Sequence, residues 1–300
     1  MSDSFVLLVV VPAIVASVVL LFGFAGCHFE HGILLDSPVI FQAVGMSETT
    51  IKVEWTYDKD TNAFEIERSH TGEDTISIVH MRESPLYFPV GPTAFEDAGP
   101  LRAGTTYTYR VRVLNRDDEE WSGWSAAVDG TTLIQTFPPS GQSTDLPNDS
   151  AGWGHTSLVQ RIEASQLAHS GTDVKITLVG PQVGEVAISG MSISQPDPQK
   201  PDPYDSAGDL TRILPPAGAF TASGRAFVGV DYTLDNSKPL LIVFDFDSSP
   251  VSIPYRNVAP QDATGYRAVA GDSYRLDRQP GYVGQNRVYL IQKIEVKPSV

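Results

Sequence analysis

The chain begins with an apolar run that contains no charged side chain, residues 5–26. At about 1.5 Å per residue, a helix of this length spans about 33 Å, enough to cross the hydrocarbon core of a bilayer. The pattern therefore predicts an N-terminal transmembrane or signal helix within residues 1–27. The rest of the chain is expected to be tethered to a membrane or exported through one.

From residue 36 the hydrophobic pattern changes to a period of two, which is typical of strands that bury one face. Ile51, Val53 and Trp55 alternate with charged residues. A longer apolar row consists of Tyr107, Tyr109, Val111 and Val113. Such runs recur about every ten residues, between turns rich in Gly, Pro and Asp, so residues 36–134 are expected to form a sandwich of about seven strands.

The second of these rows resembles part of a known family. Residues 101–115, LRAGTTYTYRVRVLN, are similar to the E–F corner and F strand of a fibronectin type III domain, and Trp55 stands in the B-strand core position. The resemblance implies that Leu101 is buried and that the Tyr107 hydroxyl bonds the preceding loop and locks this corner. It covers about residues 37–133. It implies a spacer or binding platform and, by itself, no chemistry.

Residues 121–125, WSGWS, resemble the WSxWS box of cytokine receptors. In that family two tryptophan rings interleave with arginine side chains of strand F. The resemblance implies a cation–π ladder formed here by Trp121, Trp124, Arg110 and Arg112. Two interpretations remain open: the box marks a receptor-like module, or it only stiffens one edge of the sandwich.

The second half of the chain is expected to be a separate β domain. Residues 135–151 are polar and contain Pro and Gly, which predicts an extended, exposed linker. The period-two pattern then returns, for example in residues 174–178, and residues 240–244 form the fuller apolar run of a central strand. Residues 152–300 are therefore expected to form a larger, jelly-roll-like β-sandwich of nine or ten strands. Its layout resembles β domains at the ends of phage and bacterial surface proteins, and the predicted fold class of the whole chain is all-β.

Two interpretations of the N-terminal segment remain open. Residues 24–27, FAGC, resemble the lipobox of bacterial lipoproteins, which implies cleavage before Cys27 and lipidation of its thiol. Alternatively, the apolar run stays in place as a transmembrane helix. The first basic residue is Lys52, so charge does not set the orientation. Both interpretations predict a membrane-anchored protein of the cell envelope, displayed outside the cytoplasm. The membrane is contacted through residues 5–26 if the run is retained, and through lipid on Cys27 if it is cleaved.

Charge and cysteine content exclude two other classes. The 36 acidic and 21 basic side chains give a formal charge of −15. An acidic surface repels phosphate backbones, and the sequence has no basic stripe with interleaved aromatics, so nucleic-acid binding is not expected. With a single cysteine the chain can form no internal disulfide.

Aromatic residues near Gly, Pro or Asp in presumed loops are candidates for ligand binding, because flat rings stack on sugar faces. These candidates are Trp153, Tyr204, Tyr266, Tyr274 and Tyr282. The alternative is that the rings only cover the rim of the sandwich.

Four aspartates crowd a Pro-rich loop and are candidate metal ligands, because oxygen-rich loops can hold Ca²⁺. They are Asp197, Asp202, Asp205 and Asp209. No other cofactor is expected. The sequence also contains no metalloprotease helix motif, nucleophile elbow or phosphate-binding loop, so no catalytic residue is predicted.

The sequence thus predicts a non-enzymatic, membrane-anchored surface protein that acts in adhesion, recognition or assembly. Its expected partner is a glycan, a protein receptor or further copies of itself. One alternative is a phage spike or fibre-like protein on the virion surface. Another is a glycan-active enzyme accessory or a hydrolase, which requires two carboxylates facing each other in a cleft.

Overall fold

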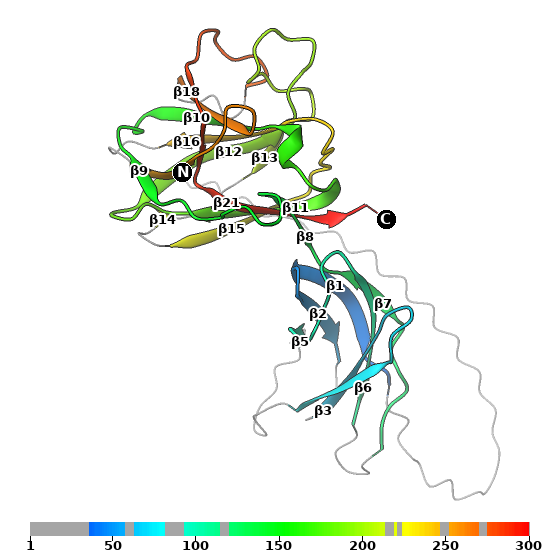
Figure 1. Ribbon diagram of the computed structural model, residues 1–300. Helices are drawn as coiled ribbons and strands as arrows, with labels where there is room; N and C mark the ends of the chain where they lie inside the picture. Colours follow the sequence, from blue (N-terminus) through cyan, green and yellow to red (C-terminus); the bar gives the residue numbers. More distant parts are fainter. Residues whose placement is uncertain are drawn as a thin grey trace, which may run out of the picture. The chain divides into compact units, whose positions relative to one another are not determined.

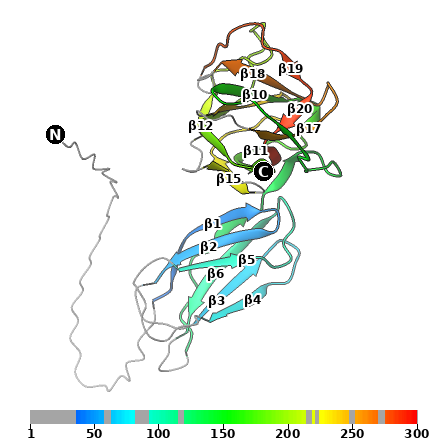
Figure 2. The same cartoon turned by 90° about the vertical axis from the view of Figure 1, so that its left-hand side faces the viewer.

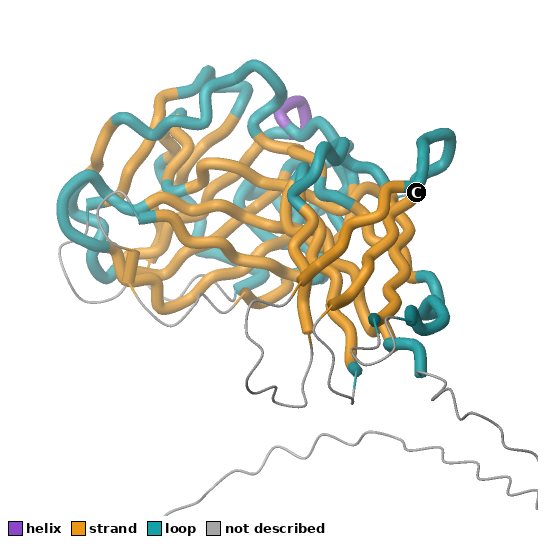
Figure 3. The backbone as a smooth tube through the Cα atoms, turned by 90° about the horizontal axis from the view of Figure 1, so that it is seen from below, coloured by secondary structure: helices purple, strands orange, loops and turns teal. Residues whose placement is uncertain are grey.

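The computed structural model describes residues 36–57, 63–81, 93–114, 120–213, 219–220, 224–246, 252–269 and 275–299. This part of the chain contains 21 strands and one short 3-10 helix, η1 (Ala164–Gln166). Figure 3 shows the strands in orange and this single turn of helix in purple. The predicted all-β fold class is confirmed.

The predicted N-terminal helix and Cys27 lie outside the described residues. The described residues include no helix with the length and apolar composition needed to cross a bilayer.

Residues 39–131 form a first module of two antiparallel sheets (Figure 2). One sheet has the strand order β1-β2-β5 and the other has the order β4-β3-β6-β7. The strands are β1 (Val39–Ser47), β2 (Thr50–Thr56), β3 (Ala63–Ser69), β4 (Ile76–Met81), β5 (Thr93–Asp97), β6 (Thr106–Val113) and β7 (Val128–Thr131). In β6 every second side chain is buried, as the alternation of the sequence predicts. The seven strands also match the expected number.

The core of this module contains the aromatic residues that the sequence analysis singled out. Trp55 is fully buried and meets Phe64 edge to face, with ring centroids 5.1 Å apart. Leu101 is buried beside it in the same cluster. The Tyr107 hydroxyl accepts a hydrogen bond of 2.8 Å from the Arg102 backbone N–H, so the predicted bond from the tyrosine to the preceding loop is present.

The same core also contains an ion pair. Arg68 and Asp97 are 4% and 1% exposed, and the Arg68 guanidinium donates to both carboxylate oxygens at 2.9 and 2.7 Å. Asp97 also accepts hydrogen bonds from the Tyr109 hydroxyl at 2.9 Å and from the Gly99 backbone N–H at 3.0 Å. Burial, together with the Asp97 carboxylate, raises the pKa of Tyr109 far above its usual value. Both oxygens of the Asp97 carboxylate thus accept hydrogen bonds from donors within the module.

Residues 134–298 form a second module of three sheets (Figure 1). The largest has the strand order β13-β12-β16-β10-β18-β19, with β14 paired to β12; the others are ordered β15-β11-β21-β8 and β20-β17-β9. The strands are β8 (Ile134–Phe137), β9 (Asn148–Ser150), β10 (Thr156–Ile162), β11 (Gly171–Val179), β12 (Val186–Ser194), β13 (Thr211–Ile213), β14 (Ala219–Phe220), β15 (Arg225–Val230), β16 (Leu240–Phe246), β17 (Ile253–Asn257), β18 (Ala263–Val269), β19 (Gly284–Gln285), β20 (Arg287–Tyr289) and β21 (Ile291–Pro298). Twelve of these strands lie within residues 152–300, where nine or ten were expected, because several are only two or three residues long.

Strand β16 is buried along its whole length, as predicted for a central strand. Leu240, Ile242 and Phe244 point into the main core of the module. Leu241 and Val243 belong to a second apolar cluster on the other face of the sheet. Tyr204, which follows β12 in the chain, belongs to this second cluster, and Tyr282 packs against it.

The predicted linker, residues 135–151, is wrong at its two ends, which belong to strands. Residues 134–137 form β8, which pairs with β21, and residues 148–150 form β9, which pairs with β17. The side chain of Phe137 is 2% exposed in the main core, and the Thr136 hydroxyl donates to the His169 carbonyl at 2.8 Å. Burial of the Phe137 side chain in this core fixes residues 134–137 against the second module, although most residues of the segment are polar. Residues 35–300 accordingly form one compact unit with two separate cores.

Candidate functional site

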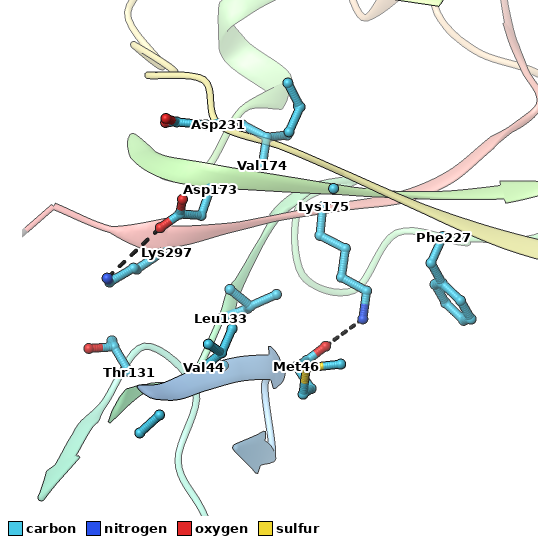
Figure 4. Close-up of a pocket in the computed structure, with 14 residues that line it drawn as sticks. Val44, Met46, Thr131, Leu133, Asp173, Val174, Lys175, Phe227, Asp231 and Lys297 are labelled. Atoms are coloured by element: carbon cyan, nitrogen blue, oxygen red, sulfur yellow. Dashed lines mark hydrogen bonds and ion pairs between the residues drawn. The ribbon is translucent and has the colours of Figure 1, made fainter. Parts of the chain in front are cut away.

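A groove of about 520 Å³ lies between strand β1 of the first module and one sheet of the second module (Figure 4). Its lining comes from β1, from the end of β7 and Leu133 beyond it, from strands β11, β15 and β21, and from Asp231 directly after β15. The lining residues are Ala43, Val44, Gly45, Met46, Thr131, Leu133, Asp173, Val174, Lys175, Phe227, Gly229, Val230, Asp231 and Lys297. The volume lies within the range of small-ligand and peptide side-chain pockets.

One end of the groove is organised by Lys175. Its ammonium donates a hydrogen bond to the Met46 carbonyl oxygen and lies 4.8 Å from the centroid of the Phe227 ring. Figure 4 shows the lysine side chain reaching from β11 toward Met46 beside this ring. The Met46 carbonyl and the Phe227 ring thus both interact favourably with the ammonium of Lys175. The Phe227 side chain remains 58% exposed.

The other end of the groove carries charged residues of both signs. Lys297 lies 3.8 Å from the carboxylate of Asp173, and both side chains are about half exposed. Asp231 follows directly after β15 and has no cationic partner among the described residues. Its carboxylate is therefore the charge at this end that a ligand can neutralise.

Strand β1 supplies an apolar wall. Val44 and Met46 are 44% and 41% exposed and line the groove, and two more exposed apolar side chains, Val39 and Phe41, precede them on the same strand. Exposed apolar side chains that line a groove, as Val44 and Met46 do, mark binding sites more often than isolated exposed residues do. The sequence indicates this wall, because residues 39–46 place apolar side chains on both faces of one strand. These residues were not among the predicted binding residues.

The predicted cation–π ladder is present on the outer face of the first module. The Arg110 guanidinium lies 4.7 Å from the Trp124 ring centroid, and that of Arg112 lies 4.9 and 4.5 Å from the rings of Trp121 and Trp124. Each arginine also pairs with a glutamate of β3, with N–O distances of 2.5 Å. The Trp124 ring thus contacts two guanidinium groups, and both arginines are paired inside the module, which favours the interpretation that the ladder stiffens the sheet.

The two serines of the WSGWS segment explain how it is held there. The Ser122 hydroxyl accepts the backbone N–H of Val113, and the Ser125 hydroxyl accepts that of Val111, both at 3.0 Å. The backbone N–H groups of the same serines donate to the carbonyls of these two residues at 2.8 Å. The segment therefore continues the sheet along β6 where a regular strand is missing.

The structure corrects the expected exposure of two candidate aromatic residues. Tyr204 is 3% exposed, and its hydroxyl accepts hydrogen bonds from the backbone N–H groups of Gly281 and Tyr282 at 2.9 and 3.3 Å. Its ring packs on those of Tyr266 and Tyr282, with centroids 5.0 and 4.9 Å away. These three rings cover the outer apolar cluster of the large sheet. Tyr274 lies outside the described residues.

Trp153 is also buried, at 4% exposure. Its ring is enclosed by Phe246 and Tyr289, whose centroids lie at 6.0 and 5.1 Å, and by the Arg267 guanidinium at 5.4 Å. An edge of the ring lines a second cavity of about 200 Å³, together with Arg267 and Gln285. A stacking face for a sugar, as expected from the sequence, is therefore not offered by this tryptophan.

The four candidate calcium ligands do not converge. Asp197 accepts the backbone N–H of Gln199 at 2.9 Å, Asp205 accepts that of Arg278 at 2.8 Å, and Asp209 accepts the Tyr232 hydroxyl. Among the described residues no three acidic, histidine or cysteine side chains are grouped so as to hold a metal ion. The structure therefore does not bring the predicted calcium ligands together: Asp197 accepts a donor of its own loop, whereas Asp205 and Asp209 accept donors of distant segments.

Burial raises the pKa of two side chains in this part of the second module, Asp205 and Tyr232. Burial raises the pKa of Asp205, although the Arg278 N–H opposes this shift. Burial, with the hydrogen bond to Asp209, raises the pKa of Tyr232 far above its usual value. Both effects are consistent with groups that fasten loops to the sheet.

Comparisons with known proteins add little to this geometry. No protein-family model and no curated protein matches the chain. Among solved structures the chain is similar to a native α-L-rhamnosidase from Aspergillus terreus, with 15% sequence identity and a TM-score of 0.33. That similarity covers 88% of this chain and 29% of the rhamnosidase chain.

Proposed function

We propose that this protein is a non-enzymatic, membrane-anchored surface protein whose β modules recognise a partner outside the cytoplasm. The first module is proposed to be a fibronectin type III domain. Its two sheets of three and four strands, its core tryptophan and its tyrosine hydrogen bond support that assignment. In this proposal the first module spaces and supports the second.

The observation on which the recognition role depends is the groove between β1 and β15. It combines an apolar wall on β1, an exposed aromatic ring on β15, and a carboxylate that lacks a described cationic partner. Sites that bind ligands typically join an apolar lining to a few polar groups that fix orientation. Its lining comes from both modules, so a ligand there contacts both at once.

A variant that fills the groove tests this proposal. A Cβ atom at Gly229 would meet nothing within 4 Å, so the backbone accepts a side chain there and Gly229→Leu adds bulk to the groove. Gly208 has the same open surroundings in a loop of the second module that does not line the groove, so Gly208→Leu is the matched control. The labelled full-length protein is applied to an array of glycans and an array of synthetic peptides. We expect a ligand that the wild type and Gly208→Leu bind and that Gly229→Leu binds at least about tenfold more weakly. Equal binding by both variants, or no ligand on either array, contradicts a recognition role for the groove.

The proposed anchor is tested separately by the intact mass of the native protein. Loss of the first 26 residues with acyl mass added at Cys27 is the result expected for the lipoprotein interpretation. An unprocessed mass, with the protein in the membrane fraction, is the result expected for a retained transmembrane helix. An unprocessed protein that is found only in the soluble fraction contradicts both interpretations.

A further inference from the structure

One edge of strand β15 has no paired strand in the part of the chain that the structure describes. The strand stands at the end of its sheet and pairs, within the described part of the chain, only with β11. The Gly180 backbone N–H donates to the Gly224 carbonyl at 2.9 Å, just before the strand begins. Hydrogen-bonded pairs recur at every second position of an antiparallel ladder, so residues 226, 228 and 230 bond β11. The backbone groups of Arg225, Phe227 and Gly229 then point to the open edge.

This open edge adjoins the groove. Phe227 and Gly229 each contribute backbone groups to the edge, and both also line the groove. A strand that pairs with β15 would direct every second side chain to the face of the sheet on which the Phe227 ring lies. Those side chains would enter the apolar surroundings of Phe227, Val44 and Met46.

The charges of the groove favour one kind of ligand. The ammonium of Lys175 is held by the Met46 carbonyl and that of Lys297 lies near Asp173. Asp231, at the end of β15, has no such cation among the described residues. A basic side chain on the ligand would complement this carboxylate and would be attracted by the net charge of −15.

We propose that the open edge of β15 and the adjoining groove bind an extended segment of a partner protein. That segment adds a strand to the sheet, places apolar side chains at alternate positions, and carries a lysine or arginine beside them. Backbone hydrogen bonds supply affinity in this mode, and the pockets for alternate side chains supply specificity. This inference rests on the proposed recognition function and names the class of its partner.

A peptide library supplies the probe. Its members alternate Val, Leu, Ile or Phe with Thr and end in Lys, and a second library contains the same compositions in scrambled order. We expect the full-length protein to bind members of the alternating library at least about tenfold more tightly than their scrambled versions, measured by fluorescence anisotropy. Equal binding of the two libraries, or no binding of either, overturns the proposal.

Two variants at one position test the backbone contact. Gly229→Pro removes the edge N–H, and proline is tolerated where that group faces away from the sheet. Gly229→Ala keeps the N–H and adds a Cβ with open surroundings. We expect the selected peptide to bind the proline variant about tenfold more weakly than the alanine variant, because an edge hydrogen bond is lost. Equal affinities, with both variants shown to be folded by hydrogen exchange, overturn strand addition.

The outcomes separate this inference from the function on which it rests. If Gly229→Leu abolishes binding of a glycan while no alternating peptide binds, the recognition role stands and the peptide class is wrong. If Gly229→Leu changes no binding, the recognition role itself fails. A dimer that forms with rising concentration, detected by light scattering and lost in Gly229→Pro, would show that β15 pairs with a second copy and would overturn the choice of partner.

Discussion

Replacing Asp97 by alanine is expected to lower the free energy of unfolding of the first module by about 3–5 kcal/mol. The carboxylate is buried and accepts hydrogen bonds from the Arg68 guanidinium, the Tyr109 hydroxyl and the Gly99 N–H. Its removal leaves the charge of Arg68 without this partner in a site that is 4% exposed. The cost of an uncompensated buried charge exceeds the cost of the lost contacts.

Urea unfolding followed by hydrogen exchange and mass spectrometry measures this loss and assigns it to one module. Glu96→Ala is the matched control, because Glu96 is exposed on the same strand and its removal should change stability by less than about 0.5 kcal/mol. The double variant Arg68→Met/Asp97→Leu should be more stable than Asp97→Ala, since it removes both charges. If Asp97→Ala is as stable as the control, the ion pair does not stabilise this core.

Replacing Tyr204 by alanine is expected to destabilise the second module by about 3–5 kcal/mol. The substitution removes a buried ring from the outer apolar cluster and leaves the N–H groups of Gly281 and Tyr282 without their acceptor. Tyr204→Phe keeps the ring and should cost about 1–3 kcal/mol through the two backbone amides alone.

Hydrogen exchange of the Gly281 and Tyr282 amides reports this effect directly, because both donate to the Tyr204 hydroxyl. Val283→Ala is the control, since Val283 is largely exposed in the same loop. Unchanged stability and exchange in Tyr204→Ala would indicate that the ring is exposed and available to a ligand, which is one of the two interpretations of the sequence.

The first module could be predicted from the sequence because its signals are local. Alternation within β2 and β6 identifies the buried faces that hold Trp55 and Tyr107, and the cation–π ladder follows from a short motif. The buried ion pair was missed, although Arg68 alternates in phase with Phe64 and Ile66 on β3. A charged residue in that register predicts a buried partner, but nothing local identifies Asp97, which lies 29 residues away.

The second module shows where local patterns are insufficient. Tyr204 and the candidate calcium ligands lie in a long loop that resembles a binding loop in composition. The conformation of this loop depends on a distant segment, because the Arg278 N–H, 73 residues further along the chain, donates to Asp205. The predicted linker failed for the same reason: β8 pairs with β21, at the far end of the chain.

The groove could not be predicted because it requires β1 and β15, which lie far apart in the sequence, to line the same cavity. The sequence does contain each half of it. The apolar side chains on both faces of β1 and the exposed phenylalanine of β15 are visible as residues, but their juxtaposition depends on the packing of two sheets.

The passage from β7 to β8 has a mechanical consequence. Only Thr132 and Leu133 separate the two strands, and both are buried. The Thr132 hydroxyl accepts the Thr105 N–H at 2.9 Å and donates to the Arg102 carbonyl at 2.6 Å. Because this junction contains no flexible linker, a force applied to a ligand bound by the second module is transmitted directly to the first module. From there the force reaches any anchor in the membrane.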